Sequence, residues 1–125
     1  MDIIISPSSD YPIYRQIEES IKTEILNHKL EMNTLLPSIR QLACDLNVSV
    51  ITVKKAYEEL EHNGFIYSFP GKGFYVSEMS EKQIDVIKKK IAACTLHKQI
   101  DYLKSLGIDK DDILSIIKEN ISYED

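Results

Sequence analysis

The sequence lacks several patterns that would place it in a specialised class. It contains no tryptophan, two cysteines, four glycines and four prolines in 125 residues. Two cysteines are too few for a disulfide framework, so we expect reduced thiols in a cytoplasmic protein. No apolar run approaches the roughly 18 residues that a membrane span needs, and the first residues lack a signal-peptide pattern. With 43% hydrophobic residues, the chain predicts one packed domain, or one small domain with an appendage.

Catalytic and metal-binding patterns are missing as well. The histidines His28, His62 and His97 are far apart in the sequence, and Cys44 and Cys94 form no C-x-x-C pair. We find no serine–histidine–aspartate set, no phosphate-cradling loop and no paired acidic site. We therefore expect no enzyme activity, no cofactor and no metal site.

Charge is unevenly distributed along the chain. The formal net charge is −5, whereas DNA-binding domains tend to be basic. Four cations nevertheless lie within residues 36–76, where we expect them on one side of the fold: Arg40, Lys54, Lys55 and Lys72. The sequence thus predicts a small cationic surface on an acidic body, and through such a surface nonspecific DNA binding is weak and salt-sensitive.

Apolar residues at helical spacing predict the first helix. Tyr14, Ile17, Ile21 and Ile25 follow one another at steps of three and four, which is one stripe of an amphipathic helix ending at about residue 27. We expect Asp10 to cap its N-terminus, ahead of a proline that a first helical turn tolerates.

Two further helices and a hairpin follow. Ser38, with a glutamine three residues later, predicts a capping box at the start of the second helix, and Ser49 predicts the cap of the third. Gly64 suits the left-handed position after a helix. Residues 65–69 and 74–77 are short aromatic-rich strands joined by a glycine-rich loop. Helix, turn, helix and hairpin in this order predict a winged helix-turn-helix, whose second helix usually enters a DNA groove.

The last part of the chain predicts two helices, over residues 81–106 and 109–121. Its apolar stripe is too long for one short helix to cover, so we expect it to pair with a second copy of the chain. The expected fold is mostly α with a small β-hairpin wing: a DNA-binding domain over residues 1–79 and a two-helix dimerisation domain over 80–125. The predicted dimer residues are Ile84, Ile87, Ile91, Cys94, Ile100, Leu103, Ile113 and Ile117.

The ordered motifs of residues 12–76 resemble the GntR family of bacterial transcription regulators. They are Pro12-Ile13-Tyr14-Arg15-Gln16-Ile17, Leu36-Pro37-Ser38-Ile39-Arg40-Gln41-Leu42-Ala43, Val48-Ser49, Thr52-Val53, Ala56-Tyr57 and Gly71-Lys72-Gly73. The short two-helix tail is similar to the YtrA branch of that family. The resemblance implies a homodimeric repressor, often of an operon that encodes an ABC transporter.

The resemblance also implies which residues contact DNA. Arg40 matches an arginine that reaches phosphate and base edges, and Thr52 and Lys54 match contact positions on the recognition helix. Gly71 and Lys72 match a wing tip that approaches the minor groove. The full predicted set is Ser38, Arg40, Ser49, Val50, Ile51, Thr52, Lys54, Lys55, Gly71, Lys72 and Gly73.

Val50 and Ile51 depart from the pattern of the family, which usually has arginine and then a polar residue at these positions. Branched apolar side chains cannot hydrogen-bond base edges, but they can pack on thymine methyl groups. We therefore expect an operator that differs from those of arginine-bearing relatives, with a tilt toward A·T pairs.

The sequence thus predicts a sequence-specific DNA-binding regulator, a homodimeric repressor of its own operon. Its expected partners are a pseudo-palindromic DNA duplex and a second copy, with no membrane; whether a small-molecule effector acts is left open. The alternative is a winged-helix module for protein–protein contact without DNA binding, which the negative charge and the apolar Val50-Ile51 pair favour slightly.

Overall fold

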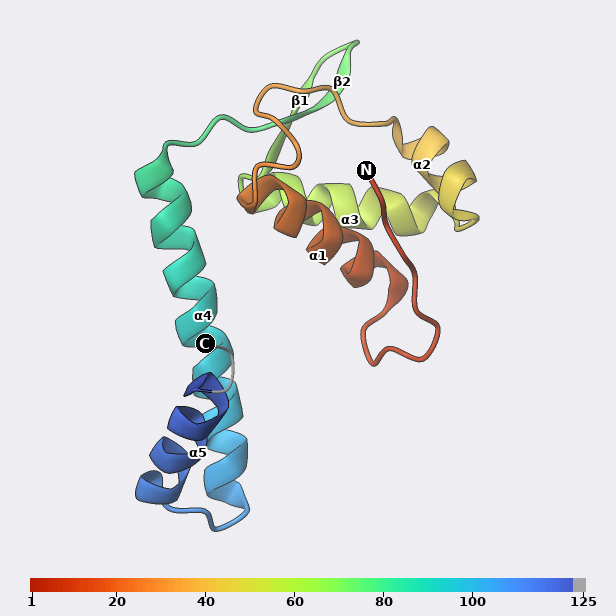
Figure 1. Cartoon of the computed structure of the whole chain (residues 1–125). Coiled ribbons are helices and arrows are strands. Elements are labelled where there is room, and N and C mark those ends of the chain that lie inside the picture. Colours follow the sequence, from red (N-terminus) through yellow and green to blue (C-terminus); the bar gives the residue numbers. More distant parts are fainter. Residues whose placement is uncertain (123–125) are drawn as a thin grey trace. The chain divides into compact units, whose positions relative to one another are not determined.

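The computed structural model describes residues 1–122. The elements follow one another as α1 (Ile13–Leu26), α2 (Ile39–Leu46), α3 (Val50–His62), β1 (Ile66–Phe69), β2 (Gly73–Val76), α4 (Glu81–Ser105) and α5 (Lys110–Ser122) (Figure 1). They form two compact units, which we call the winged unit (Met1–Ser80) and the tail unit (from Glu81 onward). The expected fold class, mostly α with a small β-hairpin wing, is confirmed.

Helix α1 supplies one layer of the winged unit. Ile17, Ile21 and Ile25 of the predicted stripe are buried, and α1 packs against α3. The expected cap is wrong. The helix begins after Pro12, whose backbone is extended at ψ 157°, so Asp10 lies before the helix in a bend. The carbonyl of Pro12 accepts the first helical hydrogen bonds, from the backbone N–H groups of Arg15 and Gln16. The proline ring fixes φ of Pro12 near −61°, a value compatible with the start of a helix.

Local hydrogen bonds define the two helices of the helix-turn-helix. The hydroxyl of Ser38 accepts a hydrogen bond from the backbone N–H of Gln41 at 3.1 Å, which confirms the predicted start of α2. The reciprocal half of the capping box is not made, because the Gln41 amide donates to Asp45 at 2.7 Å instead. Helix α2 ends at Asn47, in the left-handed region at φ 55°, and α2 then packs on α3.

The centre of the winged unit is α3. Both α1 and α2 pack against α3, which has four fully buried residues: Val53, Ala56, Tyr57 and Leu60. The Tyr57 hydroxyl donates a hydrogen bond to the carbonyl of Pro37 at 2.7 Å, which joins the middle of α3 to the segment before α2. Burial raises the pKa of the Tyr57 phenol. Tyr57 is therefore a core residue, as its place in the apolar stripe predicts.

The wing is an antiparallel hairpin that uses its two faces differently. Gly64, with φ 81°, turns the chain out of α3 as expected. Ile66 and Val76 pair and are buried, so one face of the hairpin packs on the core. The other face carries Tyr67 and Tyr75, whose rings stack with centroids 5.6 Å apart. Leu35 also forms an isolated antiparallel β-bridge with Tyr75 of β2.

In the tail unit, α5 turns back along the second half of α4 (Figure 1). Gly107, with φ 86°, follows the end of α4 and turns the chain toward α5. The carboxylate of Asp109 accepts a hydrogen bond from the backbone N–H of Asp112 and so caps the N-terminus of α5. Ile113 is buried where the two helices meet. Within residues 1–122, no helix combines the length and apolar character that crossing a bilayer requires.

Helix α4 is apolar on different faces in its two halves. Ile84, Ile87, Ile91 and Cys94 recur at steps of three and four along the first half. In the second half the apolar residues Leu96, Ile100 and Leu103 lie on another face, of which Ile100 and Leu103 are half-buried.

The residues predicted for the dimer differ in exposure within the single chain, and their pairing with a second copy stays a prediction. Ile84 and Ile113 are only 3% and 4% exposed in the single chain, and Ile117 is half-buried. Helix α5 accounts for the burial of Ile113, because it turns back along the second half of α4 after a short connection, whereas Ile84 lies in the first half. Ile91 and Cys94 remain exposed.

Candidate nucleic-acid interface

The first turn of α3 presents two apolar side chains to solvent. Ile51 is 79% exposed and Val50 is 41% exposed, although both are branched aliphatic residues. The Ser49 hydroxyl accepts the backbone N–H of Thr52 at 3.1 Å and lies 2.7 Å from the Thr52 hydroxyl. Ser49 and Thr52 therefore hold the helix start together, and the exposed contact surface of this turn is largely aliphatic.

Arg40 lies in the first turn of α2, directly after the Ser38 cap, and is exposed. Among the described residues, no hydrogen bond or ion pair engages its guanidinium. A planar group with five N–H donors that remains unpaired is suited to bind phosphate or a guanine edge in two places at once. Ser38 itself uses its hydroxyl oxygen for the cap.

The two neighbouring lysines of α3 have different surroundings. Lys54 lies 3.9 Å from Glu58, one turn further along α3, and both side chains are 62% exposed. Such an exposed pair holds the ammonium only weakly. Lys55 instead lies over the ring of Tyr14 on α1, 4.2 Å from its centroid. Lys55 therefore stabilises the packing of α1 against α3, whereas Lys54 is available for an anion.

The wing tip holds the third cationic group. Gly71 and Gly73 have φ values of 75° and 110°, which side-chain-bearing residues rarely adopt. A Cβ added at Gly71 would meet nothing within 4 Å, so turn geometry rather than crowding within the chain favours glycine there. Lys72, between the two glycines, is exposed, and its backbone N–H donates to the carbonyl of Phe69 at 2.9 Å.

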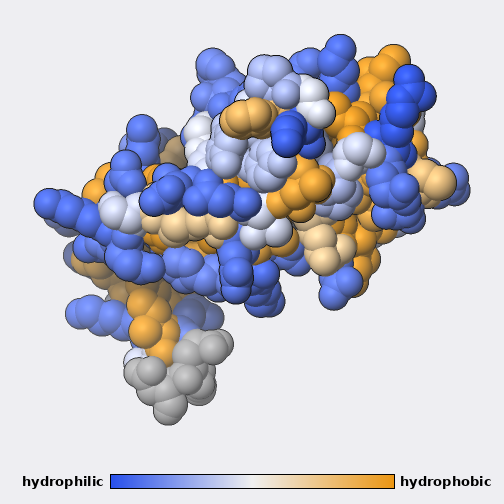
Figure 2. All heavy atoms as spheres, turned by 90° about the horizontal axis from the view of Figure 1, so that it is seen from above, coloured by the Kyte–Doolittle hydropathy of each residue, from blue (hydrophilic) through white to orange (hydrophobic). Residues whose placement is uncertain are grey.

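Two exposed apolar residues beside the wing tip were missed by the sequence reasoning. Leu35 is 55% exposed and Phe69 is 53% exposed. Alternation along β1 could have placed Phe69 on the face opposite the core. Leu35 has no comparable signal, because it reaches this face only through its bridge to Tyr75. Figure 2 shows hydrophobic side chains reaching the surface among hydrophilic ones.

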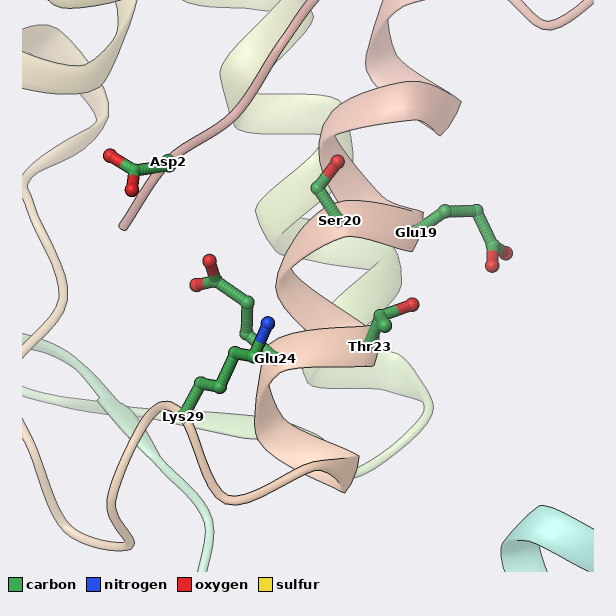
Figure 3. Close-up of a pocket in the computed structure, with 6 residues that line it drawn as sticks. All are labelled: Asp2, Glu19, Ser20, Thr23, Glu24 and Lys29. Atoms are coloured by element: carbon green, nitrogen blue, oxygen red, sulfur yellow. The ribbon is translucent and has the colours of Figure 1, made fainter.

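The winged unit also contains two hollows. One, of about 360 Å³, is lined by Asp2, Glu19, Ser20, Thr23, Glu24 and Lys29 (Figure 3). Its three carboxylates against one ammonium would repel an anion. The other, of about 710 Å³, lies between the N-terminal segment and α2. Within residues 1–122, no three histidine, cysteine, aspartate or glutamate side chains gather as metal ligands.

The comparison with known proteins decides the family. The family described as "Bacterial regulatory proteins, gntR family" matches residues 13–76, from the first helix to the end of the wing. The chain belongs to the gntR family. The HTH-type transcriptional repressor YtrA of Bacillus subtilis is 33% identical, over 86% of this chain and 93% of its own length. That match extends beyond the wing into the tail unit, and the chain lies in the YtrA-like branch of the gntR family.

Solved structures of gntR-type proteins agree. A GntR family transcriptional regulator from Listeria monocytogenes has a TM-score of 0.73 at 35% identity, covering 92% of this chain and 98% of its own. The AraR DNA-binding domain in complex with operator ORR3 has a TM-score of 0.50 at 28% identity, covering 61% of this chain and 95% of its own. This gntR-family chain is a DNA-binding transcription regulator. The alternative of a winged-helix module without DNA binding has no support among these relatives.

Proposed function

We propose that this gntR-family regulator is a homodimeric repressor that binds a pseudo-palindromic operator in its own operon. It acts in the cytoplasm, where the duplex is, and it carries no enzyme activity. YtrA of Bacillus subtilis is a repressor and is similar over most of both chains, which supports repression as the outcome. A transport operon is the gene context that we propose, following the family resemblance of the short tail.

The observation that carries the proposal is the unpaired guanidinium of Arg40 on α2, the helix that precedes the exposed first turn of α3. In a helix-turn-helix, this turn enters the major groove, and the preceding helix crosses the backbone. We assign Arg40, Lys54 and Lys72 as the charged DNA contacts, with Val50 and Ile51 packing on thymine methyl groups. Ser38, Ser49 and Thr52 support these contacts as helix caps, and the glycines Gly71 and Gly73 let the wing backbone come close to the duplex.

We propose that the tail unit forms the dimer. The exposed apolar face of the first half of α4, with Ile91 at its centre, would pair with a second copy about a two-fold axis. Two recognition helices would then meet half-sites about one DNA turn apart, or a multiple of it. We assign no effector; the hollow beside α2 has a volume in the range of small-molecule sites.

The assignment of Arg40 is tested by Arg40→Ala on a duplex that the protein itself selects from a random library. We expect operator binding to weaken by about 1–3 kcal/mol, because a two-point contact is lost. The measurement is a fluorescence-anisotropy titration at fixed salt. The matched control is Arg15→Ala, since Arg15 of α1 lies 4.5 Å from the centroid of the Tyr11 ring and is outside the predicted set of DNA contacts. Equal binding by Arg40→Ala and the unaltered chain would refute the assignment.

A further inference from the structure

The outer face of the wing is an exposed apolar surface that the proposed contacts leave unexplained. Tyr67 pairs with Tyr75 and Phe69 pairs with Gly73 in the antiparallel register. Paired residues share a face of a hairpin, and successive residues alternate between faces. Phe69 therefore lies on the same face as the two stacked tyrosines, turned away from the core.

Leu35 extends this face toward the wing tip. It bridges to Tyr75, and its Cδ1 lies 3.4 Å from the place that a Cβ of Gly73 would occupy. Leu35 and Phe69 thus flank the same glycine from the two sides of β2. Each is more than half exposed, at 55% and 53%, whereas the neighbouring tyrosines are half-buried by stacking on each other. We call Leu35 and Phe69 the wing apolar pair.

The charges around the wing apolar pair favour a polyanion as its partner. From residue 65 to residue 77 the sequence contains a single charged residue, Lys72, although the whole chain has a net charge of −5. The turn hydrogen bond from the backbone N–H of Lys72 to the carbonyl of Phe69, at 2.9 Å, holds the backbone of Lys72 next to Phe69. One carboxylate also lies at β1, since Glu61 accepts the backbone N–H of Ser68 at 2.9 Å. An apolar surface beside an exposed cation matches a groove of DNA, where sugars lie between phosphates.

We propose that the wing apolar pair packs against the sugars and base edges of the DNA minor groove while Lys72 contacts a phosphate. Apolar side chains that enter the minor groove in this way are a known means of binding DNA. The inference rests on the proposed function and adds specific contacts to it. It also explains how a chain with few cations holds a duplex: part of the affinity comes from apolar burial, which salt does not screen.

Salt dependence separates apolar from ionic contacts in the test. The full-length chain is titrated with the duplex that it selects from a random library, at several salt concentrations. We expect Phe69→Ala and Leu35→Ala each to weaken binding about tenfold at every salt concentration, as truncation of a packed anchor does. Lys72→Ala should instead reduce the slope of log K against log salt by about 1. Ile13→Ala, at an exposed apolar position of α1, is the control and should bind normally.

A spectroscopic readout reports the contact directly. Because the chain has no tryptophan, Phe69→Trp introduces a single indole at the wing. We expect its emission to shift to the blue and its quenching by acrylamide to fall when the selected duplex is added. Ile13→Trp is the matched control, and its emission should not respond to the duplex. Circular dichroism before titration checks that each variant is folded, which the exposure of these positions favours.

The outcomes separate this inference from the proposed function. Normal binding by Phe69→Ala and Leu35→Ala, together with lost binding by Arg40→Ala, would overturn the inference and leave the function intact. If the unaltered chain selects no duplex, both are wrong. A blue shift of Phe69→Trp that appears on concentrating the protein without DNA would make the face a contact between copies and would also overturn the inference.

Discussion

The winged unit and the tail unit use their apolar residues in opposite ways. In the winged unit, Ile17, Ile21 and Leu60 are fully buried, and both flanking helices meet on α3. In the tail unit up to residue 122, the buried residues are Ile84 and Ile113, while Leu96, Tyr102, Leu106, Leu114 and Ile121 are each more than half exposed. The two units belong to one chain of average hydrophobicity, so the difference lies in the arrangement of apolar residues.

This difference indicates what each unit needs in order to be stable. Three helices and a hairpin give the winged unit a core with several layers of contact. Two antiparallel helices share a single seam and leave their remaining apolar surface in water, whereas helices in proteins depend on tertiary packing for most of their stability. The winged unit therefore carries its own stability, and in the proposed dimer the tail unit would gain stability by association.

The largest expected effect is on the core of the winged unit. Ile21 has no exposed surface and lies between α1 and α3. Ile21→Ala should lower the free energy of unfolding by about 3 kcal/mol, because it removes buried methyl groups and leaves a cavity. The measurement is urea denaturation followed by tyrosine fluorescence. Ile4→Ala, at a position 86% exposed, should change stability by less than about 0.5 kcal/mol. Equal losses at both positions would contradict the core described above.

The second prediction concerns the exposed face of α4. Ile91→Asp should raise the dissociation constant of the dimer about 30-fold, because it places a carboxylate in an apolar contact without a partner. Sedimentation equilibrium measures this constant without DNA. Lys90→Asp is the control, since it alters charge on a different face of the same helix turn. A dimer that tolerates Ile91→Asp but not Lys90→Asp would place the interface elsewhere.

Local signals in the sequence predicted much of the winged unit. The caps at Ser38 and Ser49 and the helix end at Gly64 depend on hydrogen bonds and dihedral angles within a few residues, so their sequence signatures are reliable. Asp10 was wrongly predicted as a cap because two signals competed in the same turn. Pro12, with its fixed φ, defined the actual start of the helix.

Contacts between distant residues were beyond the reach of the sequence. The position of Lys55 over Tyr14 depends on the angle at which α1 crosses α3, which no local pattern encodes. The exposure of Leu35 likewise depends on a bridge across 40 positions of sequence, to Tyr75. In the tail unit, the spacing of apolar residues in α4 revealed that the apolar face shifts midway along the helix. It did not reveal which half of α4 packs against α5. The candidate site was therefore predicted as a set of residue types, and the structure supplies their partners.

The third prediction tests the hydrogen bond that joins α3 to the segment before α2. Tyr57→Phe should lower the free energy of unfolding by about 1 kcal/mol at neutral pH, because the carbonyl of Pro37 loses its donor. Urea denaturation measures the loss. Tyr11→Phe, at a residue 49% exposed, is the matched control and should unfold normally.

The same tyrosine gives the winged unit a distinctive response to alkali. The folded-state pKa of Tyr57 is raised above its ordinary value of 10.0, so its stabilising effect is complete below pH 10. Above that pH the unfolded chain releases the phenolic proton while the folded chain retains it, and stability falls by about 1.4 kcal/mol per pH unit. The difference in unfolding free energy between the unaltered chain and Tyr57→Phe should therefore shrink above pH 9 and vanish at about pH 11. A constant difference over this interval would show that the phenol ionises equally in both states.

The smallest expected effects distinguish the two adjacent lysines of α3. Lys54→Ala should weaken operator binding and reduce the salt slope by about 1, with little change in stability, because its pairing with Glu58 is exposed and weak. Lys55→Ala should lower the free energy of unfolding by about 0.5 kcal/mol, through loss of the contact with the Tyr14 ring, and leave the salt slope unchanged. Each variant is the control of the other, since both remove one ammonium from neighbouring positions. If both reduced the salt slope equally, Lys55 would leave the Tyr14 ring on binding DNA, and the cationic surface would extend across α3 toward α1.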